Sequence, residues 1–179
     1  MGLLELLFGK VEEPPRAPTR PSAVEVDKVE GGVYAACAGT LIRMEDLPDP
    51  VFASGAMGMA VGVKPSEGVV YAPVSGYVTI VTGTLHALGL TADDGIQVLI
   101  HVGVDTVNMK GDGFCCFVKK GQNVRAGEAL MTMDLDKIAE AGYSDVTITV
   151  VTNSDDYASV VQAAPGGVAA GSLVMRASC

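Results

Sequence analysis

The chain after Val24 consists of short apolar runs, separated by glycine-containing turns about every ten residues. Valine and isoleucine are frequent in these runs, and both residues favour β-strands. Evenly spaced short strands are typical of a β-sandwich or barrel. We therefore predict an all-β fold, an antiparallel β-sandwich with a few short helical turns. Strands are expected over residues 32–36, 39–43, 60–64, 68–72, 76–81, 96–102, 114–118, 129–134 and 147–151.

Two further features refine the predicted sandwich. Residues 135–141 follow Asp134, whose side chain suits a helix N-cap, and end beside Gly142, so they predict one or two helical turns. The sequence Val33-Tyr34-Ala35 before Gly39 recurs as Val70-Tyr71-Ala72 before Gly76. This weak repeat indicates an internal duplication, in which two related hairpin-like units pack face to face.

Composition limits the classes of function. The 179 residues suffice for one domain with a sizeable core, and 49% of them are hydrophobic. A net charge of −9 argues against a nucleic-acid partner, which requires a basic face, and is compatible with a basic protein partner. The four cysteines form no CxxC pair, so we expect reduced thiols in a cytoplasmic protein. They are Cys37, Cys115, Cys116 and Cys179.

The N-terminal region differs from the rest of the chain. Residues 1–22 are predicted to be a flexible tail, ahead of a single domain over residues 23–179. Leu3, Leu4, Leu7 and Phe8 follow helical spacing, but the apolar stretch is too short to cross a bilayer. A short amphipathic helix that touches a membrane surface or packs on the domain, and a frayed tail, both remain open. The proline-rich stretch that follows is typical of a linker.

The two histidines, His86 and His101, are the candidates for chemistry. Period-two alternation over residues 96–102 buries the β-branched face and turns Leu99 and His101 outward. If residues 83–86 are also extended, Thr84 and His86 share one face, and pairing of the two segments brings both imidazoles into one shallow apolar depression. A neutral imidazole nitrogen is a good nucleophile near pH 7. A second histidine can donate a hydrogen bond to a phosphoryl oxygen, and a threonine hydroxyl can fix the tautomer of that second ring.

The residues around these histidines resemble a known family. Residues 100–107 (IHVGVDTV) and 110–114 (KGDGF) are similar to the active-site signature of the glucose-class IIA component of the bacterial phosphoenolpyruvate-dependent sugar phosphotransferase system. Residues 47–53 (LPDPVFA), 70–76 (VYAPVSG), 84–87 (TLHA) and 121–128 (GQNVRAGE) resemble further segments of that family. The resemblance extends from about Val33 to the C-terminus.

The resemblance implies a duplicated antiparallel β-sandwich that acts as a phosphotransferase component. His101 would accept a phosphoryl group through Nε2 from the phosphohistidine of HPr and pass it to a cysteine on the IIB domain of a sugar permease. His86 would steady the phosphoryl oxygens, and Thr84 would orient His86. Partner docking would involve two acidic positions and two members of an apolar ring, which are Asp49 and Asp105, and Phe52 and Leu99.

The resemblance also sets expectations for cofactors and partners. The family chemistry requires no cofactor and no resident metal, although a zinc ion bridging the two histidines in a complex is compatible with the family. Some members regulate other proteins. The protein would work in the cytoplasm, with membrane contact through the permease or the N-terminal tail.

Several positions depart from better-known members of the family. Leu85 stands where a polar residue is common, Leu99 where an aromatic residue is common, and Asn108 where an acidic residue is common. Thr82 and Gly83 replace larger residues ahead of the second histidine. The docking surface is therefore expected to suit different partners. Turn or cap roles for Asp49 and Asp105, and core packing for Phe52, are alternatives to docking.

Two other functions compete on the sequence alone. Residues 121–137 resemble the late half of a biotinyl or lipoyl carrier domain, in which Lys137 would be the modified lysine. The chain is too long for such a domain, and the histidine motif would be unexplained. A zinc peptidase of related fold would use His86, His101 and Asp105 as ligands with a water in the fourth position. No further histidine remains in the chain to assist that reaction.

Overall fold

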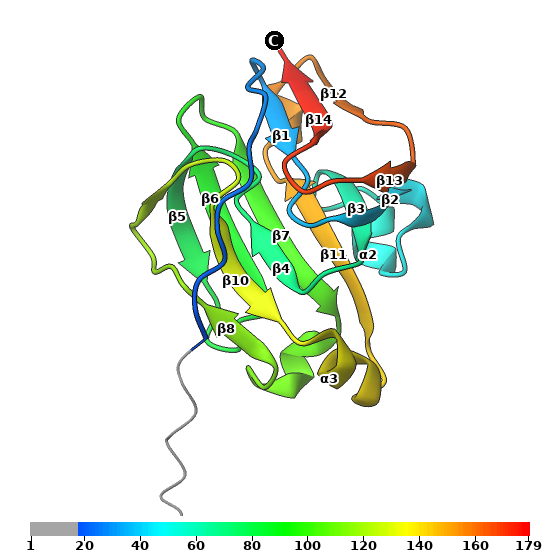
Figure 1. Ribbon diagram of the computed structural model, residues 1–179. Coiled ribbons are helices and arrows are strands. Elements are labelled where there is room, and N and C mark those ends of the chain that lie inside the picture. Colours follow the sequence, from blue (N-terminus) through cyan, green and yellow to red (C-terminus); the bar gives the residue numbers. More distant parts are fainter. Residues whose placement is uncertain (1–17) are drawn as a thin grey trace, which may run out of the picture.

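A computed structural model describes residues 18–179 as two packed β-layers with short helical segments (Figure 1). The strands are β1 (Gly32–Tyr34), β2 (Gly39–Arg43), β3 (Met59–Pro65), β4 (Val69–Tyr71), β5 (Gly76–Val81), β6 (Ala87–Ala92), β7 (Gln97–Val104), β8 (Phe114–Cys116), β9 (Asn123–Val124), β10 (Ala129–Met133), β11 (Ser144–Val151), β12 (Ser159–Gln162), β13 (Gly166–Val168) and β14 (Leu173–Ser178). The helical segments are η1 (Met44–Asp46), α2 (Pro50–Ala53), η2 (Thr106–Met109), α3 (Leu135–Glu140) and η3 (Ser154–Asp156). The expected amphipathic helix lies outside the described residues.

Every recorded strand pair is antiparallel, as predicted for the sandwich. One large sheet has the order β13-β2-β3-β11-β7-β6-β5-β9. Two three-stranded sheets, β1-β14-β12 and β4-β10-β8, lie against it. The long strands β7 and β11 run through the middle of the large sheet (Figure 1).

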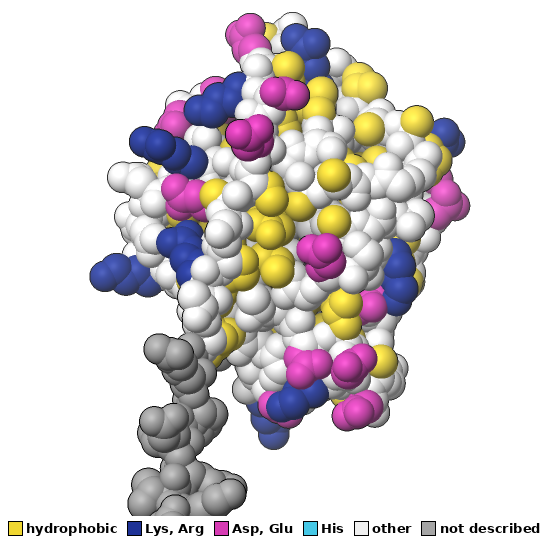
Figure 2. Space-filling model, viewed as in Figure 1, with side chains coloured by type: hydrophobic (Ala, Val, Ile, Leu, Met, Phe, Trp, Pro, Cys, Tyr) yellow, Lys and Arg dark blue, Asp and Glu magenta, His cyan; other side chains and the backbone are white. Residues whose placement is uncertain are grey.

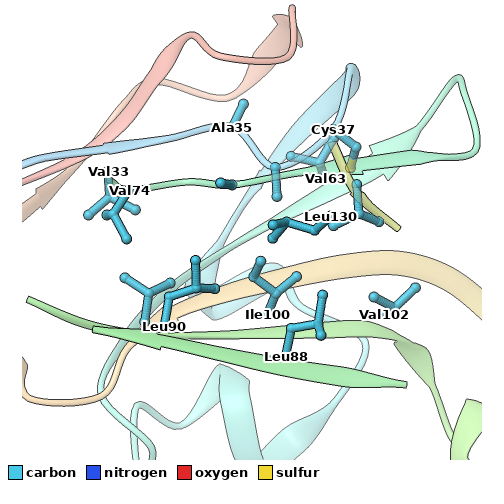
Figure 3. Close-up of a cluster of buried hydrophobic side chains, with 14 of the residues drawn as sticks. Val33, Ala35, Cys37, Val63, Val74, Leu88, Leu90, Ile100, Val102 and Leu130 are labelled. Carbon is cyan, nitrogen blue, oxygen red and sulfur yellow. The ribbon is translucent and has the colours of Figure 1, made fainter. Parts of the chain in front are cut away.

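The main core lies between these layers. On β7, Val98, Ile100 and Val102 are buried while Leu99 and His101 are only half-buried, so the predicted alternation is confirmed. Figure 3 shows side chains of the large sheet, including Leu88 and Ile100, facing Leu130 and other residues of the opposite layer. This packing fixes which face of β7 is inside and leaves the other face free for function.

A second, smaller core covers part of the outer face of the large sheet. The segment that contains η1 and α2 lies on this face, and Leu47 and Phe52 pack there against Ile148 and Val150 of β11. Gly62 on β3 makes the close approach possible, because a Cβ at this position would lie 3.0 Å from Val146 Cγ1 and would overlap the Leu47 side chain. Leu99 of β7 packs against this smaller core, whereas Ile80 on β5 is exposed.

The internal repeat is present, but its geometry differs from the expected hairpins. Within each unit the two strands belong to different sheets: β1 and β4 join the small sheets, whereas β2 and β5 join the large one. The corners between them pair with each other, since Tyr34 N–H donates to Pro73 O at 2.9 Å and Tyr71 N–H donates to Ala36 O at 2.6 Å. In each unit the chain therefore passes from one layer to the other at the corner between its two strands.

The first described residues lie along the domain. Arg20 Nε donates to Ala129 O on β10 at 2.8 Å, and Val24 N–H donates to Gly127 O at 2.9 Å. The part of the expected tail that the structure describes, residues 18–22, is thus held against β10. Figure 2 shows hydrophobic side chains beside this segment, charged side chains spread over the same face, and no histidine. Between residues 18 and 179, no helix is long and apolar enough to cross a membrane.

Candidate phosphoryl-transfer site

Pairing of β6 with β7 brings the two histidines together on the open outer face. Ala87 is the partner of His101 in this ladder, and Val102 N–H donates to His86 O at 2.7 Å. The two imidazole rings have centroids 5.3 Å apart and meet edge to face at 79°. Pairing of the two segments therefore brings the two imidazoles together, as expected from the sequence.

His101 presents a free Nε2 nitrogen. Its Nδ1 lies 2.7 Å from Gly103 O, and a carbonyl oxygen only accepts hydrogen bonds. Nδ1 therefore carries the proton, which leaves the lone pair on Nε2. Gly103 has φ +73°, and a Cβ there would overlap Thr106 Cγ2 and approach Ser144 O to 2.7 Å. Only glycine brings the carbonyl into this position without strain.

His86 lies in a tight turn rather than in the extended segment considered for residues 83–86. Leu85 N–H donates to Thr82 O at 3.0 Å, and Leu85 itself has a left-handed φ of +57°. The turn nevertheless brings Thr84 Oγ1 to 2.6 Å from His86 Nδ1. Thr82 Oγ1 lies 3.3 Å from the same nitrogen. The residue triad of Thr84, His86 and His101 is thus assembled, although by a different backbone conformation.

The environment favours the neutral form of His86. Partial burial lowers the pKa of this imidazole, and the neighbouring His101 lowers it further. If the Thr84 hydroxyl donates to Nδ1, the single proton of neutral His86 resides on Nε2. That N–H is then available to a phosphoryl oxygen.

An apolar wall borders the histidines. The Phe52 ring lies 5.1 Å from the His101 ring, centroid to centroid. Phe52 is only 7% exposed, so most of its surface is packed in the core, which was the alternative to a docking role. Leu99 is half-buried beside the same small core. Two apolar side chains nearby are much more open: Val51 on α2 is 55% exposed and Ile80 on β5 is 49% exposed.

The two acidic candidates occupy different positions. Asp49 is the N-cap of α2, and its side chain accepts a hydrogen bond from Val51 N–H at 2.8 Å. Asp105 follows β7, is exposed and has a left-handed φ of +62°. Asp49 thus has the cap role that was the alternative to docking, whereas the Asp105 side chain makes no capping hydrogen bond to η2.

Backbone strain concentrates around the site. Among the described residues, the non-glycine residues with positive φ are Leu85, Asp105 and Lys110. All three lie in the segments that carry or directly follow the two histidines. Such conformations persist only where the surrounding structure enforces them, and they cluster at functional sites.

The residues of the two competing functions are not arranged as those functions require. Lys137 lies within α3, where its Nζ pairs with Asp112 Oδ1 at 2.6 Å, rather than at the tip of a hairpin. Over residues 18–179, no three side chains of His, Cys, Asp or Glu converge on a common point. His86, His101 and Asp105 therefore do not form the zinc-ligand set of the peptidase alternative.

The sequence did not single out three features of the site. The carbonyl of Gly103 fixes the tautomer of His101, and the glycine two residues after this histidine was the available signal in the sequence. The hydroxyl of Thr82 reaches His86 only because the chain turns. The exposed Ile80 lies on the same sheet as the two histidines only because β5 pairs with β6.

Comparison with known proteins agrees with this geometry. Residues 31–157 match the family model described as phosphoenolpyruvate-dependent sugar phosphotransferase system, EIIA 1. A glucose-specific EIIA component from Halalkalibacterium halodurans is 46% identical over 126 residues, which cover 70% of this chain and 73% of the relative. Its counterpart from Bacillus cereus is 43% identical over 131 residues, with 73% and 79% covered.

A solved structure shows the same fold. Glucose permease IIA from Mycoplasma capricolum superposes with a TM-score of 0.73 at 32% identity, and the match covers 80% of this chain and 93% of that one. The family match spans well over half of the chain, and the fold agrees with it. The chain belongs to the EIIA 1 family of the phosphoenolpyruvate-dependent sugar phosphotransferase system.

Proposed function

We propose that His101 is the residue that carries the phosphoryl group in this phosphoryl carrier of the sugar phosphotransferase system. The observation that carries the proposal is the hydrogen bond from His101 Nδ1 to Gly103 O, which leaves the Nε2 lone pair free on an open face. The ring centroids of His86 and His101 are 5.3 Å apart, and this closeness supports a role for His86 in binding the phosphoryl oxygens. Thr84, at 2.6 Å from His86 Nδ1, orients that ring.

The proposed transfer balances without a cofactor. The Nε2 lone pair of His101 forms the new P–N bond while the P–N bond of the donor phosphohistidine breaks, and its electron pair returns to the donor ring. The proton of His101 stays on Nδ1 throughout and keeps its hydrogen bond to Gly103 O. In the onward step an acceptor thiolate attacks phosphorus, and the electron pair returns to Nε2. Such transfers depend mainly on positioning and charge stabilisation.

The proposed partners are phospho-HPr as donor and the IIB domain of a sugar permease as acceptor. Both would dock on the same face, where Phe52 lies against the His101 ring, Leu99 is half-buried, and Val51 and Ile80 are exposed. The exposed carboxylate of Asp105 and that of Asp49 would face a basic patch on the partner. Regulatory proteins that recognise this face would compete with HPr. The free cysteines among residues 18–179 support assignment to the reducing cytoplasm.

The transfer as proposed needs no metal. Two histidines alone provide half of a tetrahedral zinc shell, and within residues 18–179 no third side chain of His, Cys, Asp or Glu converges on them. Zinc held between His86 and His101 would therefore require ligands from a docked partner. This arrangement belongs to a complex rather than to the isolated carrier.

The proposal is tested by transfer from phosphoenolpyruvate through enzyme I and HPr, followed by intact mass and acid lability. Wild type is expected to gain one acid-labile phosphate, and His101→Ala none. His86→Gln should still be labelled but should transfer to IIB about a hundredfold more slowly, because one donor to the phosphoryl oxygens is lost. Labelling of His101→Ala to the wild-type level would overturn the proposal.

A further inference from the structure

Thr82 occupies a special position at the start of the turn that carries His86. It directly follows β5, and its backbone N–H donates to Ala87 O at 3.2 Å. Its hydroxyl oxygen lies 3.1 Å from Ala87 N, 3.1 Å from Ala87 O and 3.3 Å from His86 Nδ1. Thr82 thus closes the turn through its side chain and touches the functional imidazole with the same atom.

The hydrogen-bonding capacity of this hydroxyl can be assigned. Ala87 N–H donates to Thr82 Oγ1 and uses one lone pair. The hydroxyl hydrogen is directed to Ala87 O, which can only accept. One lone pair of Oγ1 remains, and Nδ1 of His86 is the polar atom beside it. In this arrangement Thr82 offers His86 an acceptor.

Thr84 and Thr82 therefore differ in how they act on the two charge states of His86. In the neutral ring, the Thr84 hydroxyl at 2.6 Å donates to the bare Nδ1. A ring that has gained a second proton bears N–H groups on both nitrogens, and Nδ1 then requires acceptors. The free lone pair of Thr82 and the rotated hydroxyl of Thr84 supply them. A doubly charged phosphoryl group on the neighbouring His101 would favour that second proton, which comes from water.

We propose that Thr82 is a positioning residue: its hydroxyl oxygen, fixed by Ala87, accepts a hydrogen bond from protonated Nδ1 of His86 and holds this ring in place while His101 carries the phosphoryl group. The inference rests on the proposed function, since it concerns the residue that steadies the phosphoryl oxygens. His101 is the titratable side chain that acts on His86 among the described residues.

The test is an NMR titration of the ¹⁵N-labelled unphosphorylated protein, which reports the pKa and tautomer of His86 without any partner. Thr82→Val is expected to lower the pKa of His86 further, by about 0.5, because protonated Nδ1 loses one acceptor. Thr82→Ser should restore the wild-type value. Thr91→Val on β6, which removes a hydroxyl away from the site, is the matched control and should leave the titration unchanged.

A transfer assay then separates this inference from the proposed function. In Thr82→Val, labelling of His101 by phospho-HPr should persist, while transfer to IIB should slow about threefold to tenfold. An unchanged His86 titration and an unchanged transfer rate in folded Thr82→Val, with a shifted titration in Thr84→Val, would overturn the role of Thr82. If Thr82→Val does not fold, Thr82→Ala replaces it in both measurements. Failure of wild type to accept phosphate would instead overturn the proposed function and leave the titration result standing.

Discussion

His86 is the residue whose charge the fold controls most visibly. Partial burial and the nearby His101 lower the pKa of its imidazole below the ordinary value of 6.5. As pH falls, the unfolded chain therefore takes up this proton before the folded protein does, and the linkage relation makes the folded state less stable. The contribution of neutral His86 is complete above pH 6.5 and declines below it.

This linkage gives a residue-scale prediction. The midpoint of urea unfolding of wild type should fall between pH 7 and pH 5.5 more steeply than that of His86→Gln, which cannot take up the proton. The measurement is a urea titration monitored by circular dichroism at several pH values, with equal slopes verified for both proteins. Parallel pH profiles would show that His86 titrates alike in the folded and unfolded states.

Residue-scale features were predictable where they depend on strand alternation alone. The buried Ile100 and Val102 on either side of His101 follow from the period of two, and so does the outward direction of His101. The contact of Thr82 with His86 could not be predicted in this way. It depends on the left-handed Leu85, a conformation that a leucine rarely adopts and that sequence propensities do not favour.

At the scale of elements, the end of β7 connects backbone shape to chemistry. Gly103→Ala would place a Cβ against Thr106 and Ser144 O and would displace the carbonyl that holds His101 Nδ1. Gly121→Ala is the matched control, because Gly121 has a similar φ of +85° with no atom within 4 Å of an added Cβ. Both variants acquire the strain of a left-handed alanine, about 1 kcal/mol.

We expect Gly103→Ala to lose at least about 1–2 kcal/mol more unfolding free energy than Gly121→Ala, because of the steric overlap. It should also show a mixed tautomer of His101 by NMR, whereas Gly121→Ala should keep the proton on Nδ1. Equal losses of stability and identical His101 spectra would contradict the role assigned to the Gly103 carbonyl.

Several strands were not predicted from the sequence, and they depend on pairing with other strands. β6 (ALGLTA) contains leucine, alanine and glycine and lacks valine and isoleucine, and it forms because β5 and β7 pair with both of its edges. β12, β13 and β14 were also not predicted; they complete the two layers through long-range pairs with β14, β2 and β1. The predicted helix is confirmed as α3, capped by the Asp134 side chain.

At the scale of the whole molecule, the sandwich separates a closed core from one open functional face. The fold class followed from the regular spacing of strands and turns, but the crossing of each repeat unit between layers did not. Those crossings depend on main-chain hydrogen bonds between the two corners, such as Tyr34 N–H to Pro73 O, which leave no local sequence pattern. The resulting large sheet places Ile80, His101 and the segment with η1 and α2, which packs on β11, on one surface.

This arrangement predicts where a partner binds. Ile80→Lys, at the open rim, should raise the apparent KM for phospho-HPr about tenfold, because it replaces an apolar contact and adds a positive charge facing a basic partner. Val161→Lys on β12 adds the same charge at a position that is 61% exposed and belongs to a small sheet of the other layer. Val161→Lys should transfer like wild type. Equal effects of the two variants would indicate a response to net charge rather than a docking face.

The most direct test of the whole account is to locate the phosphoryl group atom by atom. The ¹⁵N-labelled protein is phosphorylated through enzyme I and HPr, and long-range ¹H–¹⁵N correlation spectra of its two histidines are recorded. We predict phosphorus on Nε2 of His101, with the proton retained on Nδ1 opposite Gly103 O. Phosphorus on Nδ1 of His101, or on His86, would contradict it.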